Sequence, residues 1–204
     1  MVDKIVKRIA GWKGRLLSYG GRLTLLKSCL ASIRIYLMSV IKFSKWAIEA
    51  INSQMAHFFW NNQEGGKKFH LASWPMVSQK KEYGGLGVPD LQQLNMCLLA
   101  SWISRYHLNK ESLWRKIVDF KYKTCEPNIF CCPELEASPF WKGVLWACKA
   151  AKMGYSWKIG DGRTVRFWED QWFGNSSLAI QFWPLYSIVN EKGTTVAEAW
   201  DEQI

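Results

Sequence analysis

Residues 84–106 read GGLGVPDLQQLNMCLLASWISRY, and this stretch indicates where a long helix begins and what it buries. Pro89 followed by Asp90 favours a helix start, because the Asp90 carboxylate can accept hydrogen bonds from the first unpaired amides. Apolar residues then recur at steps of three or four as far as about Asn109. No Lys-Ser or Lys-Thr follows the glycines, so Gly84–Gly87 is expected to be a structural corner, not a phosphate loop.

The same helical spacing recurs on both sides of this stretch. It predicts further helices over residues 3–18, 23–41, 45–60, 112–122 and 138–152. Gly20 and Gly21 interrupt the pattern between the first two, which predicts a tight corner and a helical hairpin there. In the third helix five apolar side chains are expected to face the core, namely Ile48, Ile51, Met55, Phe58 and Phe59.

The pattern changes to period two between Tyr155 and Trp168, which predicts an antiparallel β-hairpin. A three-residue Gly160-Asp161-Gly162 loop with Gly162 left-handed is favoured, and a two-residue Asp161-Gly162 loop would shift the register. A lone ribbon is barely stable, so its apolar face should pack under Trp172 or Trp183. The predicted fold class is mainly α: helical modules with a small C-terminal antiparallel β-hairpin.

Composition fits a folded protein of this kind. The 204 residues are 49% hydrophobic and 22% charged, which argues against both a disordered tail and a membrane protein. Three of the six prolines lie in 124–139, which indicates an irregular connection. We therefore predict a basic helical module over 1–81, a central helical module over 82–137, and a helix plus hairpin over 138–204.

Positive charge is concentrated in the first of these modules. Residues 1–81 hold 14 Lys or Arg and 3 Asp or Glu, a local charge of +11, whereas residues 82–204 hold 13 and 14. Clustered cations attract polyanions, so a nucleic-acid-binding surface is predicted, and a solvated basic face without a partner is the alternative. Lys80 and Lys81 could contribute from a loop, and the main candidates are Lys13, Arg15, Arg22, Lys27, Arg34, Lys67 and Lys68.

Several short motifs, taken in order, resemble the region after the reverse-transcriptase core in plant non-LTR (LINE-type) retrotransposons. They cover nearly the whole chain: residues 12–22 (WKGRLLSYGGR), Phe58-Phe59-Trp60, residues 84–91 with Asn95, Leu113-Trp114, Lys121-Tyr122, Gly160-Asp161-Gly162, Phe167-Trp168 and Asp170-Gln171-Trp172. The resemblance implies the thumb and linker after the polymerase palm, ending before a zinc-binding region. It also implies sequence-independent binding of RNA or RNA–DNA duplex, with the upstream polymerase domain as a further candidate partner.

Catalytic chemistry is not expected of this chain. Polymerisation needs paired carboxylates that hold two metal ions, which the resembled family supplies in an aromatic-X-Asp-Asp motif, and no two of the six aspartates here are adjacent. Cys125, Cys131 and Cys132 have no second ligand pair at zinc spacing, so neither a metal nor a cofactor is expected. Two alternatives stay open: a polymerase or ribonuclease H polyprotein whose active domains lie outside this chain, and a decayed transposon remnant that acts as a protein-interaction module.

An intracellular location, nuclear or cytoplasmic, is expected. Residues from Met1 onward lack the apolar run of a secretory signal. The longest apolar stretch, 29–41, contains Arg34 and is too short to span a bilayer, so no membrane partner is expected. The six cysteines are accordingly predicted to be free thiols in a reducing compartment.

Overall fold

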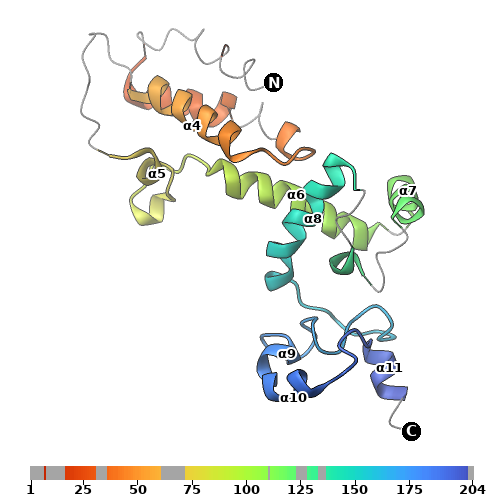
Figure 1. Ribbon diagram of the computed structural model, residues 1–204. Coiled ribbons are helices and arrows are strands. Elements are labelled where there is room, and N and C mark those ends of the chain that lie inside the picture. Colours follow the sequence, from red (N-terminus) through yellow and green to blue (C-terminus); the bar gives the residue numbers. More distant parts are fainter. Residues whose placement is uncertain are drawn as a thin grey trace. The chain divides into compact units, whose positions relative to one another are not determined.

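The computed structural model describes residues 7, 17–30, 36–60, 72–109, 111–122, 128–132 and 137–201. These residues are mainly helical (Figure 1), which confirms the main part of the predicted fold class. They hold one isolated antiparallel bridge, between Arg166 and Thr195. The chain divides into two compact units, Met1–Leu99 and Ala100–Ile204.

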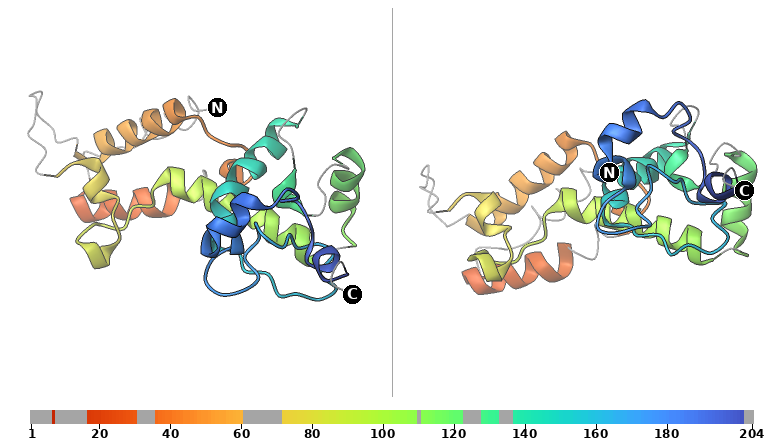
Figure 2. Two further views of the ribbon diagram at one scale, coloured as in Figure 1. Left: turned by 60° about the horizontal axis from the view of Figure 1, so that its bottom comes forward. Right: turned by 90° about the horizontal axis from the view of Figure 1, so that it is seen from below.

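The N-terminal unit is built around the apolar face of one amphipathic helix. Its elements are α2 (Tyr19–Leu25), a π-helical turn η2 (Leu26–Leu30), α4 (Lys45–Trp60), α5 (Trp74–Val77), η3 (Lys81–Tyr83) and the first half of α6 (Leu91–Leu108). All five side chains predicted to face the core from α4 are buried, together with Leu26, Met38 and Leu91. Figure 2 shows the red segment, α2 and η2, beside the yellow segment that contains α5 and η3.

The predicted glycine corner at Gly20 and Gly21 is wrong, because both residues lie inside α2. Ser18 is the N-cap, and its hydroxyl accepts a hydrogen bond from the Gly21 amide at 3.2 Å. The first amides of a helix lack backbone partners in any case, and a serine cap satisfies one of them, so the helix can start through the glycines. Apart from residues 7, 17 and 18, the predicted helix over 3–18 lies outside the described residues.

The start of α6 follows the prediction. One carboxylate oxygen of Asp90 accepts hydrogen bonds from the amides of Gln92, at 2.8 Å, and Gln93, at 3.0 Å. Leu91 and Leu99 are buried in the N-terminal unit, and Ile103 and Tyr106 are buried in the C-terminal unit. One continuous helix therefore supplies core residues to both units.

A buried side-chain amide of α6 holds the segment that precedes α4. Asn95 is fully buried, and its Oδ1 accepts from the backbone amide of Phe43 at 2.9 Å. Its Nδ2 donates to the carbonyls of Met38, at 2.7 Å, and Ile41, at 2.9 Å. A single side chain thus satisfies three backbone groups of an irregular turn that would otherwise be unpaired in the core.

The C-terminal unit is held largely by aromatic side chains. Its elements are the second half of α6, then α7 (Leu113–Lys121), η4 (Ile129–Cys131), α8 (Pro139–Ala151), η5 (Lys152–Gly154), α9 (Leu178–Gln181), α10 (Trp183–Ile188) and α11 (Val196–Asp201). Trp141 of α8 is buried and stacks on Tyr122, with ring centroids 5.3 Å apart. Trp102 makes edge contacts with Trp114, at 5.3 Å, and Phe140, at 5.2 Å.

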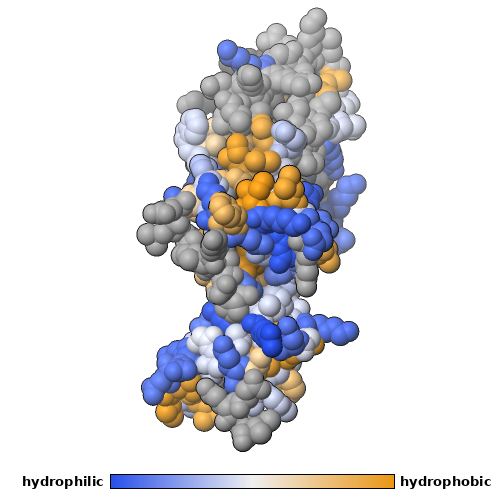
Figure 3. Space-filling model, turned by 90° about the vertical axis from the view of Figure 1, so that its right-hand side faces the viewer, coloured by the Kyte–Doolittle hydropathy of each residue, from blue (hydrophilic) through white to orange (hydrophobic). Residues whose placement is uncertain are grey.

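One side of α7 is apolar and exposed. Leu113, Ile117 and Phe120 are spaced three and four residues apart, so they lie along one side of the helix, and all three are largely exposed. Val118 is the buried residue of this helix. Figure 3 views the side on which α7 lies in Figure 1 and shows hydrophobic residues at this surface.

The helix pair α6 and α7 is joined by a buried tyrosine. The Tyr106 hydroxyl donates to Asp119, and the carbonyl of Tyr106 accepts from Arg115 at 2.7 Å. Burial, followed by the hydrogen bond to the Asp119 carboxylate, raises the pKa of Tyr106 to about 12 from its usual 10.0. The folded protein therefore holds this proton more tightly than the unfolded chain does.

This pKa shift predicts an alkaline loss of stability. The contribution of Tyr106 should be fully present below pH 10 and should disappear as the pH rises toward 12. The difference in unfolding free energy between the wild type and Tyr106→Phe should therefore shrink across this window. Urea unfolding curves of both proteins at several pH values measure the difference, and a constant gap would contradict the prediction.

The predicted hairpin between Tyr155 and Trp168 does not form, although every residue of this range is described. Gly162 is left-handed as expected, with φ of 72°, but the two arms pair with other segments. The amide of Trp157 donates to Gln171, and Phe167 donates to Thr194. The Val165 carbonyl accepts from Val196 at 2.8 Å. Partners 14 to 31 residues further along the chain thus displace the local pairing.

Among the cysteines that the structure describes, one departs from the prediction. Cys97 is an exposed free thiol, Cys131 is partly buried and Cys148 is buried, and burial raises the pKa of Cys148 to about 12. Cys132 is disulfide-bonded, so the expectation of a free thiol is wrong there. Within the described ranges, no helix combines the length and the apolar character that crossing a membrane requires.

Candidate nucleic-acid interface

The structure describes two of the seven candidate binding residues, Arg22 and Lys27. The other five lie outside the described residues, and their place on a common surface stays a prediction: Lys13, Arg15, Arg34, Lys67 and Lys68. Arg22 lies on α2 and Lys27 on η2, so the two come from consecutive helical segments. Their surroundings differ sharply.

Arg22 is a packing residue. Only 3% of it is exposed, and its Nη1 donates to the carbonyl of Phe59, near the end of α4, at 3.2 Å. Its guanidinium also lies over the ring of Tyr19, at 5.5 Å from the centroid. Tyr19 in turn makes edge contacts with Phe59 and Trp60, at 5.9 and 6.4 Å. In this position Arg22 joins α2 to α4 and does not present its charge to a phosphate group outside.

Lys27 reaches from η2 to the glycine-rich loop before α6. Its Nζ donates to the carbonyl of Leu86. A Cβ built on Gly87 would lie 3.6 Å from the Nζ of Lys27 and 3.4 Å from the Cγ of Lys81. The two lysines, 54 positions apart in the sequence, therefore converge beside Gly87.

The loop itself offers no amides to an anion. The amides of Gly84, Gly85, Leu86 and Gly87 all donate to backbone carbonyls of the chain, at distances of 2.9 to 3.1 Å. A phosphate-binding loop needs such amides free to point at the ligand. Gly84–Gly87 is accordingly a structural corner, as the sequence predicts, and any anion here would be held by side chains.

Basic residues of the N-terminal unit have few acidic neighbours. Lys45 lies 3.8 Å from Glu49 in an exposed pair, with 89% of the Lys45 side chain in solvent. Lys80 and Lys81 are exposed. In the part of the chain that the structure describes, no carboxylate lies within ion-pairing distance of Lys27, Lys80 or Lys81. Their charge thus remains available to an external anion.

Acidic residues of the described ranges serve structural contacts. Asp90 caps α6, Asp119 accepts from Tyr106, and Asp161 accepts from the Arg163 amide at 3.2 Å. Three or more His, Cys, Asp or Glu side chains do not gather anywhere among the described residues in a way that could hold a metal ion. The expected lack of a catalytic pair stays a prediction.

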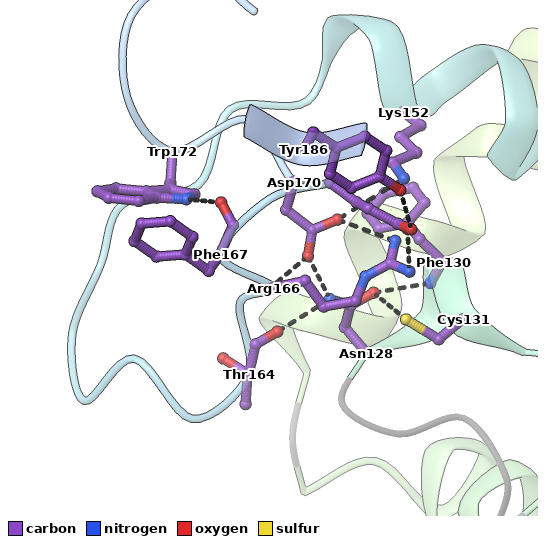
Figure 4. A network of polar contacts seen from close by, with 11 residues as sticks. Asn128, Phe130, Cys131, Lys152, Thr164, Arg166, Phe167, Asp170, Trp172 and Tyr186 are labelled. Carbon is purple, nitrogen blue, oxygen red and sulfur yellow. Dashed lines mark hydrogen bonds and ion pairs between the residues drawn. The ribbon is translucent and has the colours of Figure 1, made fainter. Parts of the chain in front are cut away.

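Sequence reasoning missed a buried polar network centred on Asp170 (Figure 4), which is 1% exposed. Its Oδ2 accepts from the backbone amide of Arg166 and from Nδ2 of Asn128, both at 2.9 Å. Its Oδ1 lies 3.3 Å from Nη2 of Arg166 and 3.8 Å from Nζ of Lys152. Asn128 also donates to the Thr164 carbonyl at 2.9 Å. This carboxylate therefore fixes η4, η5 and the segment 164–170 to one another.

An open cavity of about 930 Å³ lies beside the Gly162 turn and α11. Trp168, Trp172 and Trp200 contribute to its walls, together with Arg163 and Glu191. Figure 4 shows the Trp172 ring against Phe167, and the Trp172 indole donates to the Phe167 carbonyl at 2.8 Å. The cavity combines one arginine with the acidic residues Asp161 and Glu191, so its lining is not predominantly basic.

Two plant proteins resemble this chain. It is 30% identical over 181 residues, 87% of its length, to an Arabidopsis thaliana protein named "Putative ribonuclease H protein". The chain spans only 29% of that relative. It is 27% identical over 142 residues, 69% of its length, to an uncharacterized mitochondrial protein of Arabidopsis thaliana, and covers 92% of it. No family model and no solved structure matches the chain.

Proposed function

We propose that this chain is a non-catalytic segment of a retroelement polyprotein, from the region after the polymerase palm of a plant LINE-type reverse transcriptase. In this proposal it binds RNA or RNA–DNA duplex without regard to base sequence, through a basic helical surface of the N-terminal unit. Similarity to a longer plant protein named as a ribonuclease H protein supports the polyprotein origin. The observation that carries the binding proposal is the charge distribution, +11 over residues 1–81.

The mechanism is electrostatic. Lysines and arginines that neutralise backbone phosphates release condensed counterions, which favours binding at low salt and gives no preference for particular bases. A template and its product must slide along a polymerase, and sequence-blind phosphate contacts permit such movement.

A second candidate function rests on the exposed apolar side of α7. Leu113, Ile117 and Phe120 give the C-terminal unit a surface suited to contact with another protein. In that case the chain is a protein-interaction module, and active polymerase and ribonuclease H domains lie elsewhere in its polyprotein. Failure of the purified chain to bind any nucleic acid at low salt would favour this second candidate over the first.

The binding proposal predicts that affinity for nucleic acid depends more on where the positive charges lie in the chain than on its total charge. Glutamine at four cations of the basic module should cut affinity about a hundredfold or more at 0.1 M salt, because each lost phosphate contact removes about 0.7–0.9 from the salt slope. Those positions are Lys13, Arg15, Lys67 and Lys68. The matched control changes four exposed lysines of the C-terminal unit, Lys121, Lys142, Lys158 and Lys192, to glutamine.

Fluorescence anisotropy with a mixed-sequence RNA–DNA duplex at several salt concentrations measures both affinity and slope. The control variant loses the same net charge, so it should retain most of the wild-type slope. Equal loss in the two variants would show that binding depends on net charge alone, and it would contradict a dedicated surface in residues 1–81.

A further inference from the structure

The convergence of Lys27 and Lys81 is held in place by the chain itself. One proton of the Lys27 ammonium group is used by the Leu86 carbonyl, which anchors Nζ and leaves two N–H groups for another acceptor. The aliphatic part of Lys81 packs at the same position, with its Cγ 3.4 Å and its Cε 4.0 Å from a Cβ built on Gly87. An anion that contacts both side chains would be attracted by two positive charges at once.

The backbone conformation of the Gly84–Gly87 loop beside the two lysines is fixed by its own contacts. Gly85 packs so tightly against the preceding turn that a Cβ there would lie 2.1 Å from the carbonyl oxygen of Gln79. Gly87 has a positive φ of 67°, and the loop amides are all hydrogen-bonded within the chain. A site built on such a loop is preorganised, so little conformational entropy is lost when an anion binds.

The turn that carries Lys81 also carries an exposed aromatic ring. Tyr83 ends η3 and is 74% exposed. Tyr83 follows Lys81 by two positions in the same short 3₁₀ turn. Exposed aromatic rings flanked by cations are the feature with which proteins hold single strands, because a free base can stack on the ring while its phosphates contact the lysines.

We propose that Lys27, Lys81 and Tyr83 form a binding site for single-stranded nucleic acid, with one phosphate group held by the two lysines and a neighbouring base stacked on Tyr83. This site rests on the proposed nucleic-acid binding and narrows its substrate class. A base-paired strand buries the faces of its bases in the stack, so a duplex leaves Tyr83 without a stacking partner. Selectivity for single strands follows from the tyrosine, and affinity follows from both groups.

The test uses the full chain with a mixed-sequence single-stranded RNA and with the same RNA paired to DNA. The double variant Lys27→Gln, Lys81→Gln should bind the single strand about tenfold more weakly than the wild type. Its matched control is Lys42→Gln combined with Lys45→Gln, which removes two charges from the same unit. The affinity of this control for the single strand should change by less than about threefold. Equal losses in the two double variants would overturn the lysine site.

Tyrosine substitutions separate stacking from charge. Tyr83→Ala should weaken single-strand binding about fivefold or more, whereas Tyr83→Phe keeps the ring and should bind like the wild type. Trp46→Ala, at another exposed aromatic ring of the same unit, is the control and should have no such effect. If Tyr83→Ala weakens duplex and single-strand binding equally, or matches Trp46→Ala, the stacking site is wrong.

The outcomes also separate this site from the wider proposal. If the wild type binds in a salt-dependent way and substitutions at Lys27, Lys81 and Tyr83 leave its affinity unchanged, this site alone is overturned. The basic surface of residues 1–81 then remains as the proposed binding surface. Absence of binding to both probes at low salt overturns the site and the proposed function together. Circular dichroism melting of each variant checks that its fold is intact.

Discussion

Replacement of Asp170 by alanine is expected to lower the unfolding free energy of the C-terminal unit by about 3–5 kcal/mol. The carboxylate is 1% exposed and accepts from two nitrogen atoms of Arg166 and from Asn128. Its removal leaves the guanidinium of Arg166, whose side chain is 14% exposed, with Glu169 as its acidic neighbour. Loss of the buried carboxylate that faces this guanidinium and an unpaired amide in the interior both destabilise the folded state.

Urea unfolding followed by tryptophan fluorescence measures this loss, and amide hydrogen exchange over 163–171 shows where it acts. Asp161→Ala is the matched control, because Asp161 is exposed and accepts a single hydrogen bond from a neighbouring amide. Asp170→Asn keeps the shape but not the charge and should fall between the two. Equal stability of Asp170→Ala and Asp161→Ala would show that the network contributes little.

Asn95→Ala is expected to have a comparable effect on the N-terminal unit. The substitution leaves the Phe43 amide and the carbonyls of Met38 and Ile41 without their buried partner. An unsatisfied buried group costs about 1–3 kcal/mol, so three together predict a loss of about 3–5 kcal/mol after partial relaxation. Asn95→Asp keeps the acceptor for Phe43 but removes both donors, and it should be similarly unfavourable because it also buries a charge.

The measurement for Asn95 is again urea unfolding, combined with hydrogen exchange at the Phe43 amide. Gln93→Ala lies two residues earlier on the same helix, is exposed, and controls for the change in helix propensity. In Asn95→Ala the Phe43 amide should exchange much faster than in the wild type, while in Gln93→Ala it should not. Unchanged protection of Phe43 would mean that the turn is held by other contacts.

Features that depend on residues close in sequence were predictable. The helix over 45–60 has the predicted bounds and buries the predicted side chains, because helical spacing of apolar residues fixes both. Asp90 caps α6 as its position after Pro89 suggests. In each case the structural cause lies within one or two helical turns of the residue concerned.

Features that depend on distant partners were missed. The alternation in 155–168 predicts a hairpin, but Phe167 donates to Thr194 and the Val165 carbonyl accepts from Val196, partners that periodicity does not reveal. The glycine corner failed for a more local reason, since Ser18 caps a helix that runs through Gly20 and Gly21. Asn128, Arg166 and Asp170 come from segments whose proximity only the fold establishes.

The candidate site illustrates the same limit. Charge counting correctly identifies where cations are abundant, but it cannot separate a cation that packs from one that faces outward. Arg22 is buried against Phe59, whereas Lys27 meets Lys81 beside Gly87. Both outcomes depend on which segments lie next to α2 and η2, and that is a property of the tertiary structure.

The continuity of α6 has a practical consequence for anyone who dissects this protein. Leu99 and Ile103, one helical turn apart, are both almost completely buried, yet they serve different units. A recombinant fragment that ends or begins between them would start from a severed, frayed helix end with an apolar residue exposed to water. Truncations placed outside Leu91–Leu108 avoid cutting that helix, and limited proteolysis should leave α6 intact until the protein unfolds.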